Sequence, residues 1–393
     1  MEGLVRREML SNRVRAIKPS GIRKYFDIAA TMSDVISLGV GEPDFVTPEH
    51  IRQAGIRAIE RGETKYTSNY GTLELRSAIS ALLTTRYGVT YDPASEVLVT
   101  VGVSEGIDAA LRALLDDGDE VLIPNPGYVA YEADVTLAGG VVVPVTTSVD
   151  DHFEVKAAAI EAALTPRSKV LLLGNPNNPT GAVIERAELE KIAELAVRRD
   201  LVVISDEVYS RLVYGDEHAC IAAMPGMRER TILADGFSKA YAMTGWRVGY
   251  VAAPPHYLEA ILKVHQYAIM SAPTTAQDAA LVALTDGEPE VQRMLAEYDR
   301  RRRLVVDGFN AMGLATFEPR GAFYAFPRVS STGLDAETFA QRLLEEEHVA
   351  VIPGTAFGPS GEGHVRACYA TSYEQLEEAL RRIGRFVERS RAA

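Results

Sequence analysis

The middle of the chain alternates short apolar runs, rich in β-branched residues, with longer segments whose apolar residues recur at helical spacing. The short runs predict strands, and the longer segments predict helices. Strands that alternate with helices indicate an α/β fold, in which a mostly parallel central sheet carries helices on both faces. Strands are expected at 96–101, 120–123, 141–145, 169–173, 201–205 and 231–234, and helices at 105–115, 156–163 and 187–199.

The pattern changes after Pro289. A long charged helix is expected at 290–312, then a helix at 336–347, short strands near 349–352 and 364–369, and a final helix. This order predicts a separate, smaller α+β domain. A chain of 393 residues is also too long for one core, since cores stop growing at about 250–300 residues. We expect an N-terminal lid segment that packs on the small domain, a large domain and a small C-terminal domain, at 1–48, 49–285 and 286–393.

Composition and charge narrow the class of function. The net charge of −13 disfavours binding to nucleic acid phosphates. Arginine-rich stretches at 300–303 and 381–391 alternate with acidic and apolar positions, which predicts solvated helix faces. Cys220 and Cys368 are the only cysteines, so neither a disulfide framework nor a recognisable metal cluster is expected. With no signal peptide and no apolar run of membrane-spanning length, we expect a cytoplasmic protein without metal, nucleic acid or membrane partners.

Candidate chemistry follows the predicted strands, where ligands bind in parallel sheets. The glycine-bearing turn 102–106 opens a helix and suits a phosphate, although such turns are also plain connections. The segment 175–181 contains two Asn-Pro pairs, which form a rigid turn or aim an amide into a cleft. Asp206 ends a buried strand, and Tyr209 follows one helical turn later. Either a helix N-cap role or a protonated pyridine nitrogen would satisfy that carboxylate.

Lys239 stands among apolar and small residues in the segment 237–250. Buried ammonium groups are costly, and lysine amines form imines with aldehydes. Arg247 follows eight residues later, and its planar fork could hold a phosphate. The alternative is an exposed lysine with a salt-bridged arginine. The neighbouring run Met243, Thr244, Gly245 and Trp246 argues against simple exposure.

Taken together, these segments resemble the signature set of the class I/II aminotransferases, which have the fold type I architecture. The resemblance runs from 37–44 to 365–369 and covers nearly the whole chain. It implies pyridoxal 5′-phosphate as the cofactor. It also implies transfer of an amino group from an L-amino acid to 2-oxoglutarate by a ping-pong mechanism. The partners would then be small molecules, namely an amino acid and a 2-oxo acid.

The resemblance also implies a role for each matching residue. Lys239 corresponds to the Schiff-base lysine and Asp206 to the partner of the pyridine nitrogen, while Tyr209 and Asn178 correspond to the residues that bind the phenolic oxygen of the ring. Tyr128 corresponds to the aromatic that stacks on the ring. The phosphate would be held by Val103, Ser104, Ser238 and Arg247. Some relatives carry a hydroxyl where Gly236 stands here.

Further matches concern the substrate and a partner subunit. Arg366, Gly39 and Asn178 are expected to hold the substrate, with Arg366 clamping its α-carboxylate, and Ile22 is expected to line the side-chain pocket. Tyr66 corresponds to a tyrosine that reaches the phosphate in the partner subunit, which implies a homodimer.

The amino donor is expected to be aromatic or aspartate-like. The segment 17–26 resembles bacterial and archaeal enzymes for these substrates, and Ser104 stands where some aspartate-preferring relatives have a lysine. The segment 263–267 resembles an enzyme for N-acetyl-diaminopimelate, which is the alternative within the class. A pyridoxal-phosphate-dependent lyase on the same fold is a further alternative. A transcription regulator would need an N-terminal winged helix, yet the catalytic pattern begins by Ile17.

Overall fold

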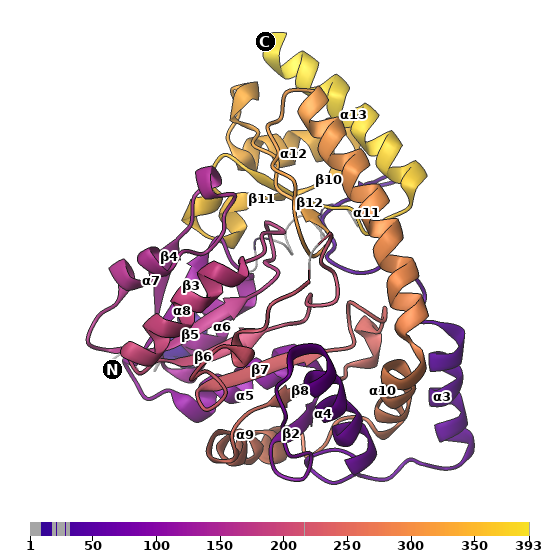
Figure 1. Ribbon diagram of the computed structural model, residues 1–393. Helices are drawn as coiled ribbons and strands as arrows, with labels where there is room; N and C mark the ends of the chain where they lie inside the picture. Colours follow the sequence, from indigo (N-terminus) through magenta and orange to yellow (C-terminus); the bar gives the residue numbers. More distant parts are fainter. Residues whose placement is uncertain (1–8, 18–20, 22–27, 29–31, 216, 393) are drawn as a thin grey trace, which may run out of the picture.

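A seven-stranded sheet forms the centre of the larger part of the computed structural model, which describes residues 9–17, 21, 28, 32–215 and 217–392 (Figure 1). The strand order is β2-β8-β7-β6-β5-β3-β4. Neighbouring strands are parallel except at β8, which runs antiparallel to β2 and β7. The predicted fold class is therefore confirmed. The strands are β2 (Val97–Thr100), β3 (Glu120–Asn125), β4 (Val141–Thr146), β5 (Ser168–Gly174), β6 (Val202–Asp206), β7 (Thr231–Gly236) and β8 (Gly249–Ala252).

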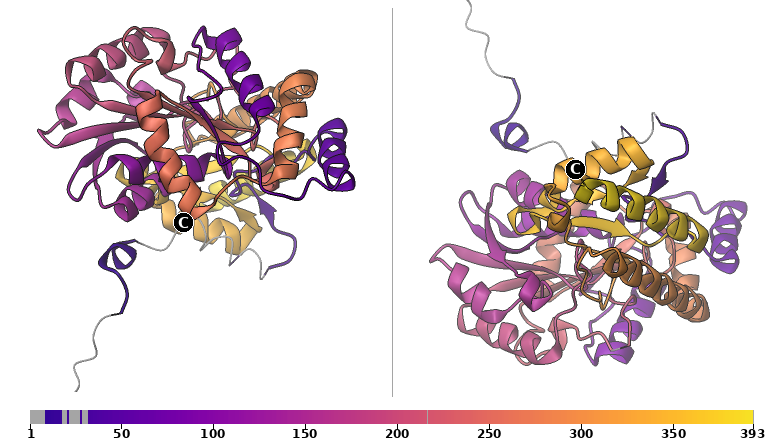
Figure 2. Two further views of the ribbon diagram at one scale, coloured as in Figure 1. Left: turned by 90° about the horizontal axis from the view of Figure 1, so that it is seen from below. Right: turned by 90° about the horizontal axis from the view of Figure 1, so that it is seen from above.

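Helices cover both faces of this sheet (Figure 2). Alternate residues of one strand point to opposite faces, so Leu171 contacts one helical layer while Leu172 contacts the other. One face packs against α5 (Gly102–Leu114), α6 (Val129–Ala138) and α9 (Pro255–Ala268). The other face packs against α3 (Glu49–Glu60), α4 (Leu73–Tyr87), α7 (Ala157–Ala163), α8 (Arg186–Arg198) and α10 (Thr274–Asp286). Burial on both faces explains why the inner strands are nearly continuous apolar runs.

A second group of elements, the small-sheet region, lies at the top of Figure 1. It contains a three-stranded antiparallel sheet in the order β11-β12-β9, and β1 pairs in parallel with β10. The predicted strand at 349–352 is in fact two short strands in different sheets. The elements are β1 (Ile36–Ser37), β9 (Tyr324–Ala325), β10 (Val349–Ala350), β11 (Ile352–Pro353), β12 (Val365–Cys368), α11 (Glu288–Ala311), α12 (Ala336–Glu347) and α13 (Tyr373–Ala392).

The segment before α3 contacts both parts of the molecule. Ile36 and Leu38 are buried in the core of the small-sheet region. In contrast, the short helix α1 (Asn12–Ala16) lies on α6, where Arg13 donates to the Leu137 carbonyl at 3.5 Å and pairs with Asp117. The division of the chain at residues 48 and 285 stays a prediction.

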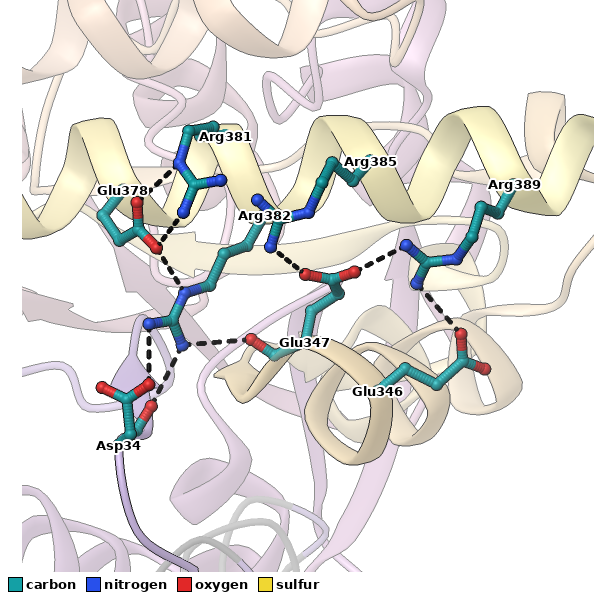
Figure 3. A network of polar contacts seen from close by, with 8 residues as sticks. All are labelled: Asp34, Glu346, Glu347, Glu378, Arg381, Arg382, Arg385 and Arg389. Atoms are coloured by element: carbon teal, nitrogen blue, oxygen red, sulfur yellow. Dashed lines mark hydrogen bonds and ion pairs between the residues drawn. The ribbon is translucent and has the colours of Figure 1, made fainter.

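An arginine and glutamate network holds the small-sheet region together (Figure 3). Arg382 pairs with Asp34, just before β1, at 2.9 Å, and also donates to the backbone carbonyl of Glu347 at 3.2 Å. The Glu347 carboxylate, at the end of α12, accepts from Arg385 at 2.5 Å and from Arg389 at 2.7 Å. The network therefore ties β1 and α12 to the last helix.

The prediction of solvated arginine faces is wrong for two residues of α11. Arg301 and Arg302 are only 5% and 6% exposed. Arg301 pairs with Asp44 at 2.8 Å, and Arg302 pairs with Asp299 at 2.6 Å. Nearby carboxylates satisfy the guanidinium groups, so the apolar stems of these side chains can pack inside the protein.

Within the residues that the structure describes, no helix combines the length and apolar character needed to cross a bilayer. The same residues contain no group of three or more His, Cys, Asp or Glu side chains suited to holding a metal ion.

Candidate active site

A cavity of about 360 Å³ opens beyond the carboxyl ends of β5, β6 and β7, and its wall includes residues of the small-sheet region. Parallel sheets bind ligands at this position. Ten of the residues singled out from the sequence line it: Val103, Ser104, Tyr128, Asn178, Asp206, Tyr209, Ser238, Lys239, Arg247 and Arg366.

Lys239 follows β7 and is half-buried at the cavity wall. Its Nζ donates a hydrogen bond to the carbonyl of Gly41 at 2.6 Å. Burial lowers the pKa of Lys239 to about 8. A lysine with such a pKa is partly neutral near pH 7, and a neutral amine can act as a nucleophile or as a base.

Asp206 is the last residue of β6 and is buried. Its carboxylate accepts from the Tyr131 hydroxyl at 2.7 Å and from the backbone N–H of Val208 at 3.1 Å. Burial raises the pKa of Asp206 to about 6, and these two donors oppose that rise. A buried carboxylate gains most from a cationic partner, so a positively charged ring nitrogen would be stabilised here.

Arg366, on β12, is buried against two aromatic rings, with its guanidinium carbon 4.7 Å from the ring centres of Tyr324 and Phe357. Nη1 donates to Oδ1 of Asn178 at 2.9 Å, and Nη2 donates to the carbonyl of Gly39 at 2.5 Å. Its buried Nε has no hydrogen-bond partner within the described part of the chain. Buried donors are normally paired, and a carboxylate is the ligand that best matches a guanidinium fork.

The start of α5 and Arg247 lie together at one corner of the cavity. Val103 and Ser104 lie in the first turn of this helix, whose free N–H groups favour negative charge. Gly102 has a φ of +76°, and a Cβ there would lie 2.7 Å from Nη2 of Arg247. Glycine is thus required both by the backbone conformation and by the close approach of the guanidinium. Ser238 lines the same cavity.

The remaining three predicted site residues are Gly39, Tyr66 and Ile22. Gly39 does not line the cavity, but its carbonyl contacts Arg366. Tyr66 is 79% exposed and lies outside the cavity of its own chain. Ile22 lies outside the described residues.

Two tyrosines that the sequence analysis did not select also line the cavity. Tyr131 binds Asp206, and the Tyr324 hydroxyl lies 2.7 Å from the Tyr209 hydroxyl. Tyr131 follows Tyr128, the N-cap residue of α6, by three residues, and their ring centroids are 5.4 Å apart. That spacing could have identified Tyr131. Tyr324 has no comparable local signal, because β9 is remote in sequence from the other site residues.

The geometry agrees with comparisons to known proteins. Residues 33–383 match the family model "Aminotransferase class I and II", so the chain belongs to that family and is an aminotransferase, as predicted. YugH of Bacillus subtilis is 52% identical to it over 97% of this chain and 99% of its own. An aspartate aminotransferase of Pyrococcus abyssi is 48% identical, with 95% of this chain and 97% of that protein covered. The crystal structure of an aromatic aminotransferase from Pyrococcus horikoshii is similar with a TM-score of 0.90 and 45% identity, covering 95% of this chain and 100% of that one.

Proposed function

We propose that this enzyme uses pyridoxal 5′-phosphate to move an amino group from an aromatic L-amino acid to 2-oxoglutarate. One observation carries the proposal: the Lys239 amine, the Asp206 carboxylate and the Arg366 guanidinium come from three separate elements and line one cavity. When bound, this cofactor supplies an electron sink for charge that develops at the substrate Cα.

The residues of the cavity fit this cofactor. Lys239 would hold it covalently, and Asp206 would pair with its ring nitrogen. Tyr209 and Asn178 would bind the ring oxygen, and Tyr128 would cover the ring face. The corner made by Val103, Ser104, Ser238 and Arg247 would hold the phosphate, because Gly102 leaves Arg247 room beside the first turn of α5.

The side chains of this enzyme then have distinct tasks in the reaction. Arg366 binds the α-carboxylate of each substrate, using the fork that already contacts Asn178 and Gly39. Lys239 would remove the proton from the Cα of the amino donor and, in the second half-reaction, deliver a proton to the Cα derived from the 2-oxo acid, since an amine with a pKa of about 8 suits both roles near neutral pH. Asp206 stabilises positive charge at the cavity floor throughout.

An aromatic donor is favoured by the charges on the cavity wall. Among the described residues, the cationic side chains of that wall are Lys239, Arg247 and Arg366, and each already has a task. An apolar side chain needs no further cation, and burying a ring is worth about 25 cal/mol per Å². The second carboxylate of 2-oxoglutarate would be met by Arg23 or Lys24, which lie outside the described residues.

Two measurements test the proposal. Borohydride reduction followed by peptide mapping is expected to find the cofactor on Lys239, and its attachment to another lysine would refute the assignment. The kcat/KM values for phenylalanine, aspartate and N-acetyl-diaminopimelate are then compared. A hundredfold preference for either of the last two, about 2.7 kcal/mol in transition-state binding, would overturn the aromatic assignment. Turnover without any 2-oxo acid would instead indicate a lyase.

We also propose that the enzyme is a homodimer in which Tyr66 reaches the phosphate of the partner site. Tyr66 and Tyr267 are 79% and 87% exposed. Their segments lie together, because Thr274 donates to the Lys65 carbonyl at 2.7 Å and Asn69 donates to the Met270 carbonyl at 2.8 Å. Exposed aromatic groups of this kind are typical of interfaces.

A cytoplasmic location is part of the same proposal. Cys220 and Cys368 are both free and buried. A reducing compartment suits free thiols of this kind.

A further inference from the structure

Two buried phenols from different parts of the chain meet beside the cavity. Tyr209 follows β6 of the seven-stranded sheet, whereas Tyr324 belongs to β9 of the small-sheet region. Their hydroxyl oxygens are 2.7 Å apart, and both side chains are buried. At this distance one hydroxyl must donate a hydrogen bond to the other.

The backbone holds this pair in a fixed position. The N–H of Ala322 donates to the Leu212 carbonyl at 2.8 Å, and the N–H of Tyr214 donates to the Arg320 carbonyl at 2.9 Å. These bonds lie just after Tyr209 on one segment and just before Tyr324 on the other. The hydroxyl contact therefore depends on the chain fold and not on a flexible side chain.

Each phenol has a single proton, so the direction of the hydrogen bond between them decides whether Tyr209 can also donate to a ligand. Burial raises the pKa of both phenols, so each is neutral and has one proton to donate. If Tyr209 donated to Tyr324, it would have no proton left for a ligand. The Arg366 guanidinium opposes the rise of the pKa of both phenols, but it is the Tyr324 ring against which it packs, 4.7 Å from the ring centre. A nearby cation makes Tyr324 a better donor.

We propose that Tyr324 is a positioning residue whose hydroxyl donates to Tyr209 and thereby directs the Tyr209 proton into the cavity, toward the ring oxygen of the cofactor. This inference rests on the proposed function, because it concerns how the chain binds that cofactor. Successive hydrogen bonds in a buried chain strengthen one another, so Tyr209 becomes a stronger donor than it would be alone.

Gly41 makes room for the Tyr324 hydroxyl. A Cβ at position 41 would lie 2.2 Å from that oxygen, so the Tyr324 hydroxyl would have to shift if any other residue stood there. The Gly41 carbonyl also accepts a hydrogen bond from Nζ of Lys239. A single backbone residue thus contacts the lysine on one side and the tyrosine pair on the other.

The test is a pH titration of the visible absorption of the bound cofactor, in the wild type, Tyr324→Phe, Tyr209→Phe and the double variant. Donation to the ring oxygen stabilises its negative charge and lowers the proton affinity of the nitrogen that joins the cofactor to Lys239. Loss of one neutral hydrogen bond is expected to raise the titration midpoint in Tyr324→Phe by about half a pH unit. Adding Tyr324→Phe to Tyr209→Phe is expected to leave the titration midpoint where Tyr209→Phe alone puts it. Equal shifts in both backgrounds, or none in either, would overturn the proposal.

Tyr369→Phe is the matched control. It removes a hydroxyl from a second buried tyrosine pair, in which Tyr369 donates to Tyr214 at 3.3 Å, and Tyr369 does not line the cavity. The control is expected to leave the midpoint unchanged, so a shift as large as that of Tyr324→Phe would assign the effect to packing and overturn the proposal.

Gly41→Ala provides a second route if Tyr324→Phe folds poorly. The added methyl group displaces the Tyr324 hydroxyl and is expected to raise the midpoint as well, with a smaller rise when Tyr324 is already phenylalanine. An unchanged midpoint in Gly41→Ala would count against the proposal. If the cofactor is attached to Lys239 in neither the wild type nor any variant, the proposed function itself is refuted. That outcome is distinct from a failure of the inference about Tyr324.

Discussion

The Tyr131 hydroxyl donates a 2.7 Å hydrogen bond to the Asp206 carboxylate at the floor of the cavity. This bond opposes the burial that raises the pKa of Asp206 to about 6. Tyr131→Phe removes it and is expected to raise the pKa of Asp206 further. A hydrogen bond to a charged group contributes about 1.5–3 kcal/mol, so kcat/KM should fall about tenfold or more.

The pH profile of kcat/KM identifies the cause of this loss. In the proposed function Asp206 must be ionised to pair with the ring nitrogen, so the defect of Tyr131→Phe should be larger at pH 6 than at pH 8. Tyr257→Phe, on α9 and away from the cavity, serves as a control and should match the wild type. A defect of equal size at both pH values would contradict the role given to Tyr131.

Arg366→Lys is expected to raise KM for both the amino acid and the 2-oxo acid and to lower kcat/KM about 100-fold. Lysine keeps the charge but lacks the planar fork that meets a carboxylate with two donors. Steady-state kinetics with both substrates measure the effect. Arg303→Lys, on the exposed side of α11, is the comparison. A loss confined to one substrate would show that Arg366 does not bind the carboxylate common to both.

Tyr66 is expected to act in the site of the partner subunit. Tyr66→Ala and Lys239→Ala should each be nearly inactive, whereas a mixture of the two should recover activity. In a mixed dimer one site receives Tyr66 from one subunit and Lys239 from the other. Activity is followed after subunit exchange, which is confirmed with tagged chains. Hybrids that exchange and stay inactive would disprove the shared site.

Asp235 predicts a pH dependence of stability. It is buried on β7, and burial raises its pKa to about 7, whereas an unfolded aspartate has a pKa of about 3.9. The unfolded chain therefore releases this proton first, and the folded state loses stability as the pH rises from about 4 to about 7. Asp235→Asn has no such proton and keeps an acceptor for the Gly236 N–H, which now donates to Oδ1 at 2.6 Å.

The melting temperature of the apoenzyme tests this prediction. The melting temperature of Asp235→Asn minus that of the wild type should increase between pH 4.5 and 7 and then level off. A difference that stays constant over this range would show that Asp235 does not titrate as its burial implies.

The sequence predicts the parallel strands because their apolar runs are long and fully buried. β8 was not predicted, since Gly249–Ala252 is short and directly follows the glycine-rich segment after Lys239. It runs antiparallel between β2 and β7, a position that the alternation of strands and helices does not indicate. Likewise, β10 and β11 lie in separate sheets although only Val351 divides them.

The candidate site could be predicted as far as its residues follow strands in recognisable motifs. Asp206 and Lys239 each come at or just after a strand end, and strand ends of one sheet lie together. Tyr324 could not be found in this way. Its hydroxyl lies near Tyr209 because the fold brings the two segments together, as in the hydrogen bond from the Ala322 N–H to the Leu212 carbonyl. Such a long-range contact leaves no periodic pattern in the sequence.

The pairing of β1 with β10 has a consequence for how the protein is made. Ile36 and Ser37 leave the ribosome long before Val349 and Ala350, their partners in the sheet. At a synthesis rate of about 5–20 residues per second, this strand waits about 15 to 60 seconds for its neighbour. During that time Ile36 and Leu38, which are buried in the finished protein, have no core to enter. The seven-stranded sheet, whose strands lie between these two segments, can form within that interval. The small-sheet region is therefore completed last, and the active site with it.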